Sequence, residues 1–214
     1  MWWSDERIRL YEKAASASSF HKDLTDLIVN ELTEGESVVE LGCGLGYITN
    51  ELTDRGYDAI GIDTDEKAIA FAKGHFSSSA FILSDAYSAP VVRDVALAVF
   101  FGRIREEDNL ETLLSSCTKK LIYIQNEHAG SGDTDYSKSL ATEKYLKERN
   151  ISYRMALHRL SFNQPLSSAE EAESFIKENY KNRKNNTSIE KTDDGYIAIN
   201  RKAFGLFVIH KEDK

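Results

Sequence analysis

Short apolar runs alternate with amphipathic stretches between residues 38 and 124. The runs have the length of buried strands and predict strands at 38–41, 58–63, 80–83, 95–101 and 121–124. Between them, apolar side chains three or four positions apart, such as Ala68, Ile69 and Ala72, predict helices. A similar stripe from Leu110 to Cys117 predicts the helix before the fifth strand. This alternation is typical of a doubly wound α/β fold with a mostly parallel sheet.

The two flanks of this region are less regular. Residues 4–34 predict two helices, and this leading segment either folds over a binding pocket as a lid or packs on the sheet. After residue 124 the pattern predicts a polar loop over 125–136, a helix over 138–149, a strand over 152–160, a helix over 167–180, a mobile polar loop over 181–194 and a last strand over 203–210. We expect one domain over 1–214, with leading helices at 1–34 and the core at 35–214.

The first predicted strand runs into a turn with three glycines. From Val38 to Ile48 the sequence is Val-Val-Glu-Leu-Gly-Cys-Gly-Leu-Gly-Tyr-Ile. Glycine tolerates positive φ and has no Cβ, so a ligand can lie directly against this backbone. The spacing differs from the G-x-G-x-x-G of dinucleotide-binding enzymes, because Tyr47 and Thr49 stand where that pattern needs glycine.

The pattern E-x-G-x-G-x-G, from Glu40 to Gly46, resembles the first motif of the class I S-adenosylmethionine (SAM) methyltransferases. Two further matches follow in the family's order, a Gly-Ile-Asp that ends at Asp63 and a Ser-Asp-Ala around Asp85. The resemblance covers roughly residues 35–125 in motif and most of the chain in topology. It implies a Rossmann-like, mostly parallel seven-stranded sheet with an antiparallel last strand, helices on both faces, and SAM as cofactor.

The resemblance also implies roles for residues at the strand tips. Asp63 would accept hydrogen bonds from both ribose hydroxyls, and Asp85 would accept one from the adenine amino group. Glu40 would either face the ammonium group of SAM or fix the glycine turn. The other expected cofactor contacts are Gly42, Cys43, Gly44, Gly46, Thr64, Ala86 and Phe101. An acid at the end of a strand can instead cap a helix or close a turn.

Candidates for the acceptor side are fewer. Arg103 could hold a carboxylate or phosphate of the acceptor, or be a solvated residue at the start of a helix. His128 could act as a general base, or simply be exposed in its loop. Tyr11 and His21 in the leading segment are further catalytic candidates, although Tyr11 also suits a place in the core. The residues after the fourth strand lack the Asn/Asp-Pro-Pro-aromatic motif of enzymes that methylate nucleobase amino groups.

Composition narrows the substrate class and the compartment. Lys and Arg number 27 and Asp and Glu 35, a formal charge of −8, so no basic face for a nucleic acid is evident. The two cysteines give no spacing for a metal site or a disulfide framework. No apolar run approaches the ~18 residues of a membrane span and no secretory signal is visible, so we expect a cytoplasmic protein.

These patterns together predict a SAM-dependent methyltransferase that acts on a small molecule, mainly by positioning it. The alternatives are an enzyme that methylates RNA or protein, and a SAM-binding module without transfer activity. Basic surface would favour the first alternative and a degraded cofactor motif the second. The sequence leaves the oligomeric state open, with a homodimer as one option.

Overall fold

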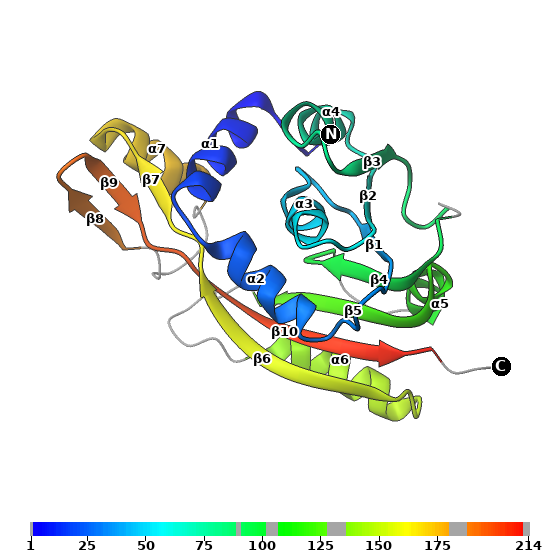
Figure 1. Cartoon of the computed structure of the whole chain (residues 1–214). Coiled ribbons are helices and arrows are strands. Elements are labelled where there is room, and N and C mark those ends of the chain that lie inside the picture. Colours follow the sequence, from blue (N-terminus) through cyan, green and yellow to red (C-terminus); the bar gives the residue numbers. More distant parts are fainter. Residues whose placement is uncertain (1, 89–90, 102–106, 128–135, 180–187, 212–214) are drawn as a thin grey trace.

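The computed structural model describes residues 2–88, 91–101, 107–127, 136–179 and 188–211. Its centre is a seven-stranded sheet with the order β3-β2-β1-β4-β5-β10-β6 (Figure 1). The strands are β1 (Val38–Leu41), β2 (Ala59–Asp63), β3 (Ala80–Leu83), β4 (Arg93–Val99), β5 (Cys117–Glu127), β6 (Tyr153–Ser161) and β10 (Arg201–His210). β10 is antiparallel to both of its neighbours, whereas β1 to β5 pair in parallel. The predicted Rossmann-like sheet with an antiparallel last strand is confirmed.

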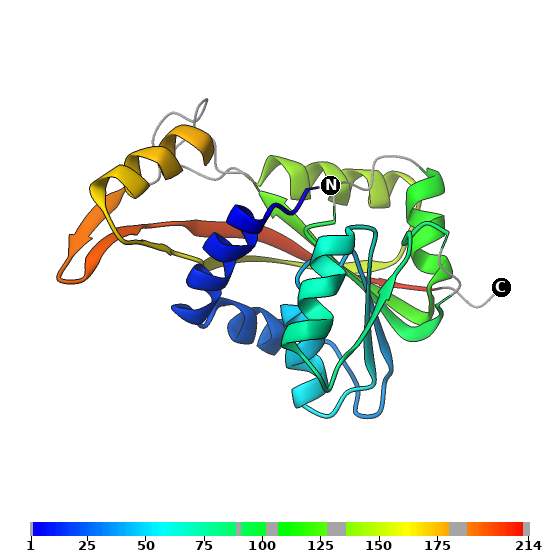
Figure 2. The same cartoon turned by 90° about the horizontal axis from the view of Figure 1, so that it is seen from above.

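Helices cover both faces of this sheet (Figure 2). They are α1 (Asp5–Ser16), α2 (Phe20–Val29), α3 (Tyr47–Asp54), α4 (Glu66–His75), α5 (Glu107–Ser115), α6 (Ser137–Glu148) and α7 (Ala169–Asn179). Side chains of α2 and α3 join Val38 in one buried cluster, and those of α5 and α6 join Val39 in another. Neighbouring strand residues point to opposite faces, so these clusters are the two halves of one α/β/α core. None of the helices in the described ranges has the length and apolarity to cross a membrane.

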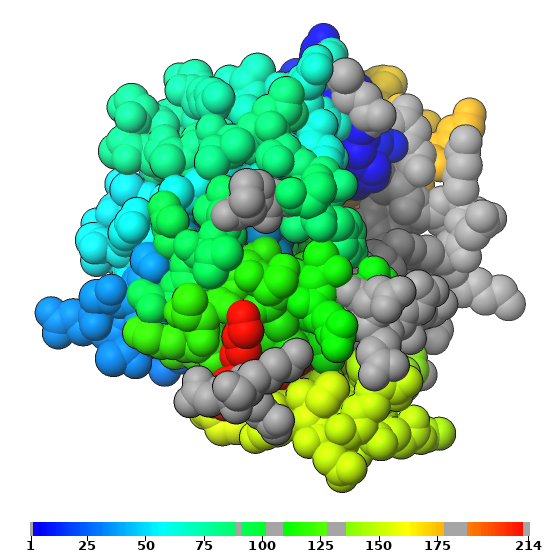
Figure 3. Space-filling model, turned by 90° about the vertical axis from the view of Figure 1, so that its right-hand side faces the viewer, coloured from blue at the N-terminus to red at the C-terminus, as the bar shows by residue number. Residues whose placement is uncertain are grey.

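β5 is longer than the apolar pattern predicts. It begins at Cys117, which the pattern placed on the preceding helix, and continues through Glu127, which the pattern placed in a loop. The antiparallel ladder with β10 pairs Glu127 with Ala203 and Lys120 with His210, so backbone partners exist beyond the apolar run. Figure 3 shows the side of the molecule where β10 ends, in red, below the segment from β3 to α5.

β4 is displaced toward the amino terminus relative to its prediction. It ends at Val99 rather than at residue 101, because Phe100 has a φ of 53°, which is a left-handed conformation. Beyond this turn, Phe100 packs against the cluster on one face of the sheet and Phe101 against the cluster on the other. The chain therefore leaves β4 with an aromatic side chain on each side of the sheet's carboxyl edge.

A second, three-stranded sheet has the order β7-β9-β8. Its strands are β7 (Gln164–Leu166), β8 (Ile189–Thr192) and β9 (Gly195–Ala198). α7 packs on it through a small cluster that contains Leu166, Ala172 and Ala198. The predicted loop over 181–194 is therefore wrong for residues 189–192, and the prediction missed β9. The sequence did offer a signal, since Asp193, Asp194 and Gly195 are typical turn residues and the first two form the hairpin loop, but the strands are too short and polar for the apolar pattern to mark them.

Candidate functional site

A cavity of about 1250 Å³ lies at the carboxyl edge of the seven-stranded sheet. The strand order reverses between β1 and β4, and ligands of open α/β sheets bind at such a point. We call residues 40–48 and 63–65, which follow β1 and β2, the floor of the cavity. We call residues 2–21, which include α1, its roof. Side chains of both line the cavity, together with residues that follow β3, β4 and β5.

The three glycines of the floor have different reasons to be glycine, although each has a positive φ. A Cβ on Gly42 would overlap the ring of Phe101. A Cβ on Gly46 would come within 2.6 Å of Phe81 and 2.9 Å of Ala72. A Cβ on Gly44 would instead point into the cavity, 3.4 Å from the ring of Trp3. Packing within the chain therefore requires the outer two glycines, and only the middle one leaves open backbone for a ligand.

Asp63 both lines the cavity and holds the glycine turn in place. One of its carboxylate oxygens accepts the N–H of Gly44 at 2.8 Å, and the other accepts the N–H of Asp65 at 2.8 Å. A carboxylate oxygen has two lone pairs, so both oxygens can accept a further hydrogen bond from the cavity. The predicted ligand role and the alternative structural role are compatible in this residue.

Glu40 lies beneath the turn and is almost fully buried. It accepts a hydrogen bond from the Thr49 hydroxyl at 2.5 Å. Burial raises the pKa of Glu40 to about 7, and the negative charge of Asp63 adds to this effect. Cys43 is buried beside it, and a Cβ on Gly61 would come within 2.8 Å of the Cys43 sulfur, so the turn packs tightly on β2. The side chain of Cys43 is therefore a packing element, and burial raises its pKa.

The residues after β3 form the third part of the predicted cofactor site. Asp85 is exposed and accepts the N–H of Tyr87 at 3.0 Å, which makes it a turn residue as well as a cavity residue. Ala86 is buried beside it, and the ring of Phe101 lies 5.5 Å from that of Tyr87. Thr64 is exposed at the rim. The fold brings all ten predicted cofactor contacts to one cavity.

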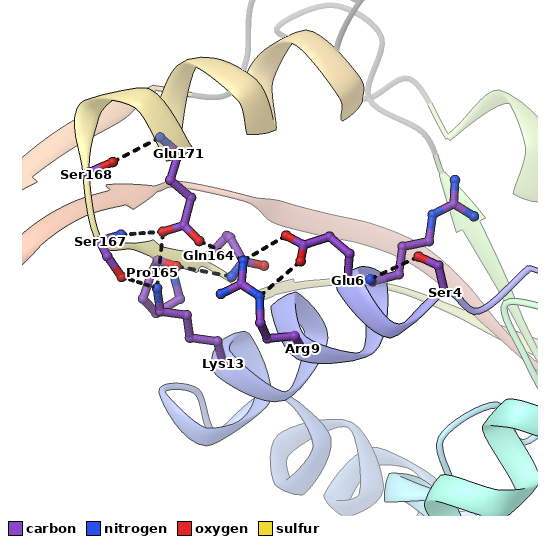
Figure 4. A network of polar contacts seen from close by, with 10 residues as sticks. Ser4, Glu6, Arg9, Lys13, Gln164, Pro165, Ser167, Ser168 and Glu171 are labelled. Carbon is purple, nitrogen blue, oxygen red and sulfur yellow. Dashed lines mark hydrogen bonds and ion pairs between the residues drawn. The ribbon is translucent and has the colours of Figure 1, made fainter.

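The roof is attached to both sides of the cavity. The N–H groups of Trp2 and Trp3 donate to one oxygen of Asp65 at 2.7 and 3.0 Å. At the other end, Glu171 of α7 pairs with Arg9 at 2.9 Å and with Lys13 at 3.3 Å (Figure 4). Residues 2–13 thus bridge from the floor to α7, which packs on the second sheet. Sequence reasoning missed Trp3, for which two tryptophans just before a predicted helix were the only signal.

Tyr11 and His21, which both belong to the roof, form a hydrogen-bonded pair. The Tyr11 hydroxyl lies 2.8 Å from Nε2 of His21, and both residues line the cavity. Burial lowers the pKa of His21 to about 4, with a further contribution from the positive charge of Lys202. Burial also raises the pKa of the Tyr11 hydroxyl well above its usual range. Both side chains are therefore neutral near pH 7, so the pair can offer hydrogen bonds without carrying a charge.

The basic residues Lys138 and Lys202 also line the cavity, together with Gln125 and Asn126 at the end of β5. Glu127 accepts hydrogen bonds from the N–H of Lys138 and from the hydroxyl of Ser139, which fixes the first turn of α6 at this edge. Sequence reasoning missed these residues, because nothing in their local sequence separates them from surface residues. The predicted candidates Arg103 and His128 lie outside the described residues, so their roles stay predictions.

Comparisons with known proteins agree with this geometry. Residues 38–121 match the family model of a methyltransferase domain, whereas no curated protein matches the chain. The YcgJ protein from Bacillus subtilis is 12% identical, with a TM-score of 0.57 over 88% of this chain and 98% of that one. The plantazolicin methyltransferase BpumL, in complex with S-adenosylhomocysteine (SAH), is 16% identical, with a TM-score of 0.56 over 99% and 93%. The magnesium protoporphyrin IX methyltransferase from Synechocystis with bound SAH is 13% identical, with a TM-score of 0.55 over 99% and 89%.

At such identities the structural neighbours show the fold, and the match at 38–121 adds the methyltransferase domain that contains the glycine turn. Residues 38–121 match a methyltransferase domain, and this match together with the shared fold supports a class I, Rossmann-like, SAM-dependent methyltransferase with SAM as its cofactor. The predicted family, enzyme class and cofactor are confirmed.

Proposed function

We propose that this enzyme methylates a small molecule, which it encloses between the roof and the carboxyl edge of the sheet. The observation that carries the proposal is the cavity itself, whose roof of aromatic and polar side chains is anchored at both ends. A site of this kind surrounds a small acceptor and excludes water from the reacting atoms. The formal charge of −8 further disfavours a nucleic acid acceptor.

The floor is proposed to hold SAM, which supplies an activated methyl group on a sulfonium. Gly44 offers bare backbone, and Asp63 has lone pairs for the ribose hydroxyls. Glu40, once ionised, would favour the ammonium group from beneath the turn. Asp85 and the N–H of Ala86 would contact adenine, while Gly42, Cys43, Gly46, Thr64 and Phe101 complete the walls. The acids of the floor suit a ligand that carries positive charge.

Tyr11 and His21 are proposed to orient the acceptor. When the Tyr11 hydroxyl donates to His21, its oxygen can accept a hydrogen bond from an O–H or N–H group in the cavity. Such a contact would direct a lone pair of the acceptor atom toward the methyl group, and positioning supplies much of the rate in reactions of this type. The pair would then act in the same enclosed space as the floor.

Transfer of labelled methyl from SAM tests this proposal. Purified enzyme and labelled SAM are added to a cell extract that is then divided by size. We expect label in a small-molecule product that is separable from SAM and that does not form without the enzyme. Label found only in RNA or protein would replace the proposal with the macromolecular alternative.

The roof provides a second test of the same proposal. Removal of residues 1–20 takes away the buried Ala14 and Phe20 and so should lower the free energy of unfolding, but we expect turnover to fall far more, because the strands of the sheet remain. Equal losses of turnover and stability would contradict a lid role for this segment.

A further inference from the structure

The acidic and basic residues that line the cavity come from different segments of the chain. The acidic residues lie at or just after the carboxyl ends of β1, β2 and β3, and they are Glu40, Asp63, Asp65, Glu66 and Asp85. The two lysines among the lining residues, Lys138 and Lys202, come from the start of α6 and of β10. The acidic segments suit the positive charge of SAM, so the lysines suit an acceptor that carries negative charge.

Lys202 is placed among aromatic rings rather than on open surface. Its ammonium nitrogen lies 5.5 Å from the ring centroid of Phe100 and 5.6 Å from that of Phe162. Both distances allow an attraction between the cation and the face of a ring. The ring of His21 lies 5.5 Å from the same Phe162 ring, and the positive charge of Lys202 helps to lower the pKa of His21. The ammonium group and the Tyr11–His21 pair therefore share Phe162 as a neighbour, and all three residues line the cavity.

The walls around this ammonium group are apolar and flat. The rings of Phe20 and Phe162 are 4.8 Å apart, and the ring of Tyr11 lies 5.1 Å from Phe162. Phe20 and Phe162 are buried, and Phe100 lies 6.4 Å from Phe20 in a stacked arrangement. Such surfaces favour the faces of a planar, apolar body. The Lys202 ammonium group among these rings favours a ligand that also carries a negative group.

We infer that the acceptor is a small molecule that carries a carboxylate and a planar apolar group about the size of a ring, and that Lys202 binds the carboxylate. The inference rests on the proposed function and names its substrate class. The planar group lies against Phe100 and Phe20, while a hydroxyl or amino group of the same molecule faces Tyr11 and His21. That group forms the new bond to the methyl carbon, the carbon–sulfur bond breaks with its electron pair left on sulfur, and the group's proton passes to solvent. The carboxylate is not methylated, so the product remains an anion.

The charge of the labelled product tests this inference. The small-molecule fraction of the extract, labelled as above, is passed over an anion exchanger at pH 8. We expect the label to be retained and to stay in the product under mild alkaline hydrolysis. Label in an unretained product other than SAM itself, or label released as methanol from an ester, would overturn the inference. Label only in macromolecules would instead overturn the proposed function, so the two failures are distinguishable.

Variants link the retained product to Lys202. K202M keeps the aliphatic stem and removes the charge, and we expect it to lower the label in the retained fraction at least tenfold. K202R should restore most of it, and K191M, an exposed lysine of β8, should match the unaltered enzyme. Calorimetric binding of SAM should be unchanged in K202M, because Lys202 is not among the residues proposed to contact SAM. Undiminished retained label in K202M, or a loss that K202R does not restore, would overturn the role of Lys202.

Discussion

The floor and the roof of the cavity are built by different interactions. The floor is held by backbone hydrogen bonds to Asp63 and by glycines packed against buried side chains. The roof combines buried residues such as Phe20 with exposed ion pairs on α1, such as Arg9 with Glu171, whose side chains are 51% and 21% exposed. Buried packing tolerates almost no change in volume, whereas exposed ion pairs each contribute roughly 0–1 kcal/mol. The floor is therefore rigid, whereas the exposed attachments of α1 cost little to break.

The largest expected effect separates two glycines of the floor. Gly46→Ala places a methyl group against Phe81 and Ala72 in a left-handed conformation, so we expect a loss of about 2–5 kcal/mol in unfolding free energy. Gly44→Ala carries only the conformational cost of about 1–2 kcal/mol, because its methyl group enters the cavity. SAM affinity should nevertheless fall at least tenfold in Gly44→Ala. Denaturant unfolding and calorimetry measure the two quantities, and equal stability losses would refute the distinction.

Asp63 should affect both binding and the shape of the turn. Asp63→Ala removes the acceptor for the N–H groups of Gly44 and Asp65, and we expect SAM affinity to fall by about 1–3 kcal/mol. Asp63→Asn keeps one acceptor oxygen, and its SAM affinity should lie between those of the unaltered protein and Asp63→Ala. Unchanged affinity in a folded Asp63→Ala protein would remove this residue from the site.

Ionisation of Glu40 should make the free energy of unfolding depend on pH, and Glu40→Gln should lack this contribution. Burial raises the pKa of Glu40 to about 7, above that of a solvated glutamate, so its contribution to stability is present at low pH and is lost as pH rises through 7. The unfolding free energy without ligand should therefore decrease from pH 4.5 to pH 8 more in the unaltered protein than in Glu40→Gln.

Binding of SAM should show the opposite trend with pH. An ionised Glu40 favours a cation, so SAM affinity should rise by up to about tenfold from pH 6 to pH 8. Glu40→Gln reports any change that comes from the ionisation of SAM itself. Parallel pH profiles of affinity in the two proteins would contradict a role for the Glu40 charge.

The smallest expected effect is on the roof. Glu171→Gln weakens the pairs with Arg9 and Lys13, and we expect less than about 1 kcal/mol of lost stability. Amide exchange of α1 should become faster while the strands of the main sheet stay protected. Glu173→Gln, on an exposed position of the same helix, is the matched control. A loss of several kcal/mol would mean that the roof is as integral to the fold as the floor.

Most of the floor could be predicted from the sequence because its signals are local. The apolar runs that precede the glycine turn and Asp63 mark buried strands, and the glycine spacing fixes a backbone that few other residues allow. The chain order of the two segments then places both at one edge of a parallel sheet, since strands joined by helical crossovers run in the same direction. Even here, local sequence could not tell which glycine faces the cavity and which faces a neighbouring side chain.

The part of the cavity that we propose for the acceptor was determined by tertiary structure alone. Lys202 comes near His21 only because β10 inserts between β5 and β6 and presents its first residues at the edge that the roof covers. Nothing within a few residues of either position encodes that proximity, since an antiparallel strand late in the chain pairs with partners far away in sequence. The same holds for Glu171, which meets Arg9 across 162 positions. The sequence by itself thus determined the strands and the cofactor turn, while the long-range pairing of β10 and the docking of α1 on α7 determined what surrounds the acceptor.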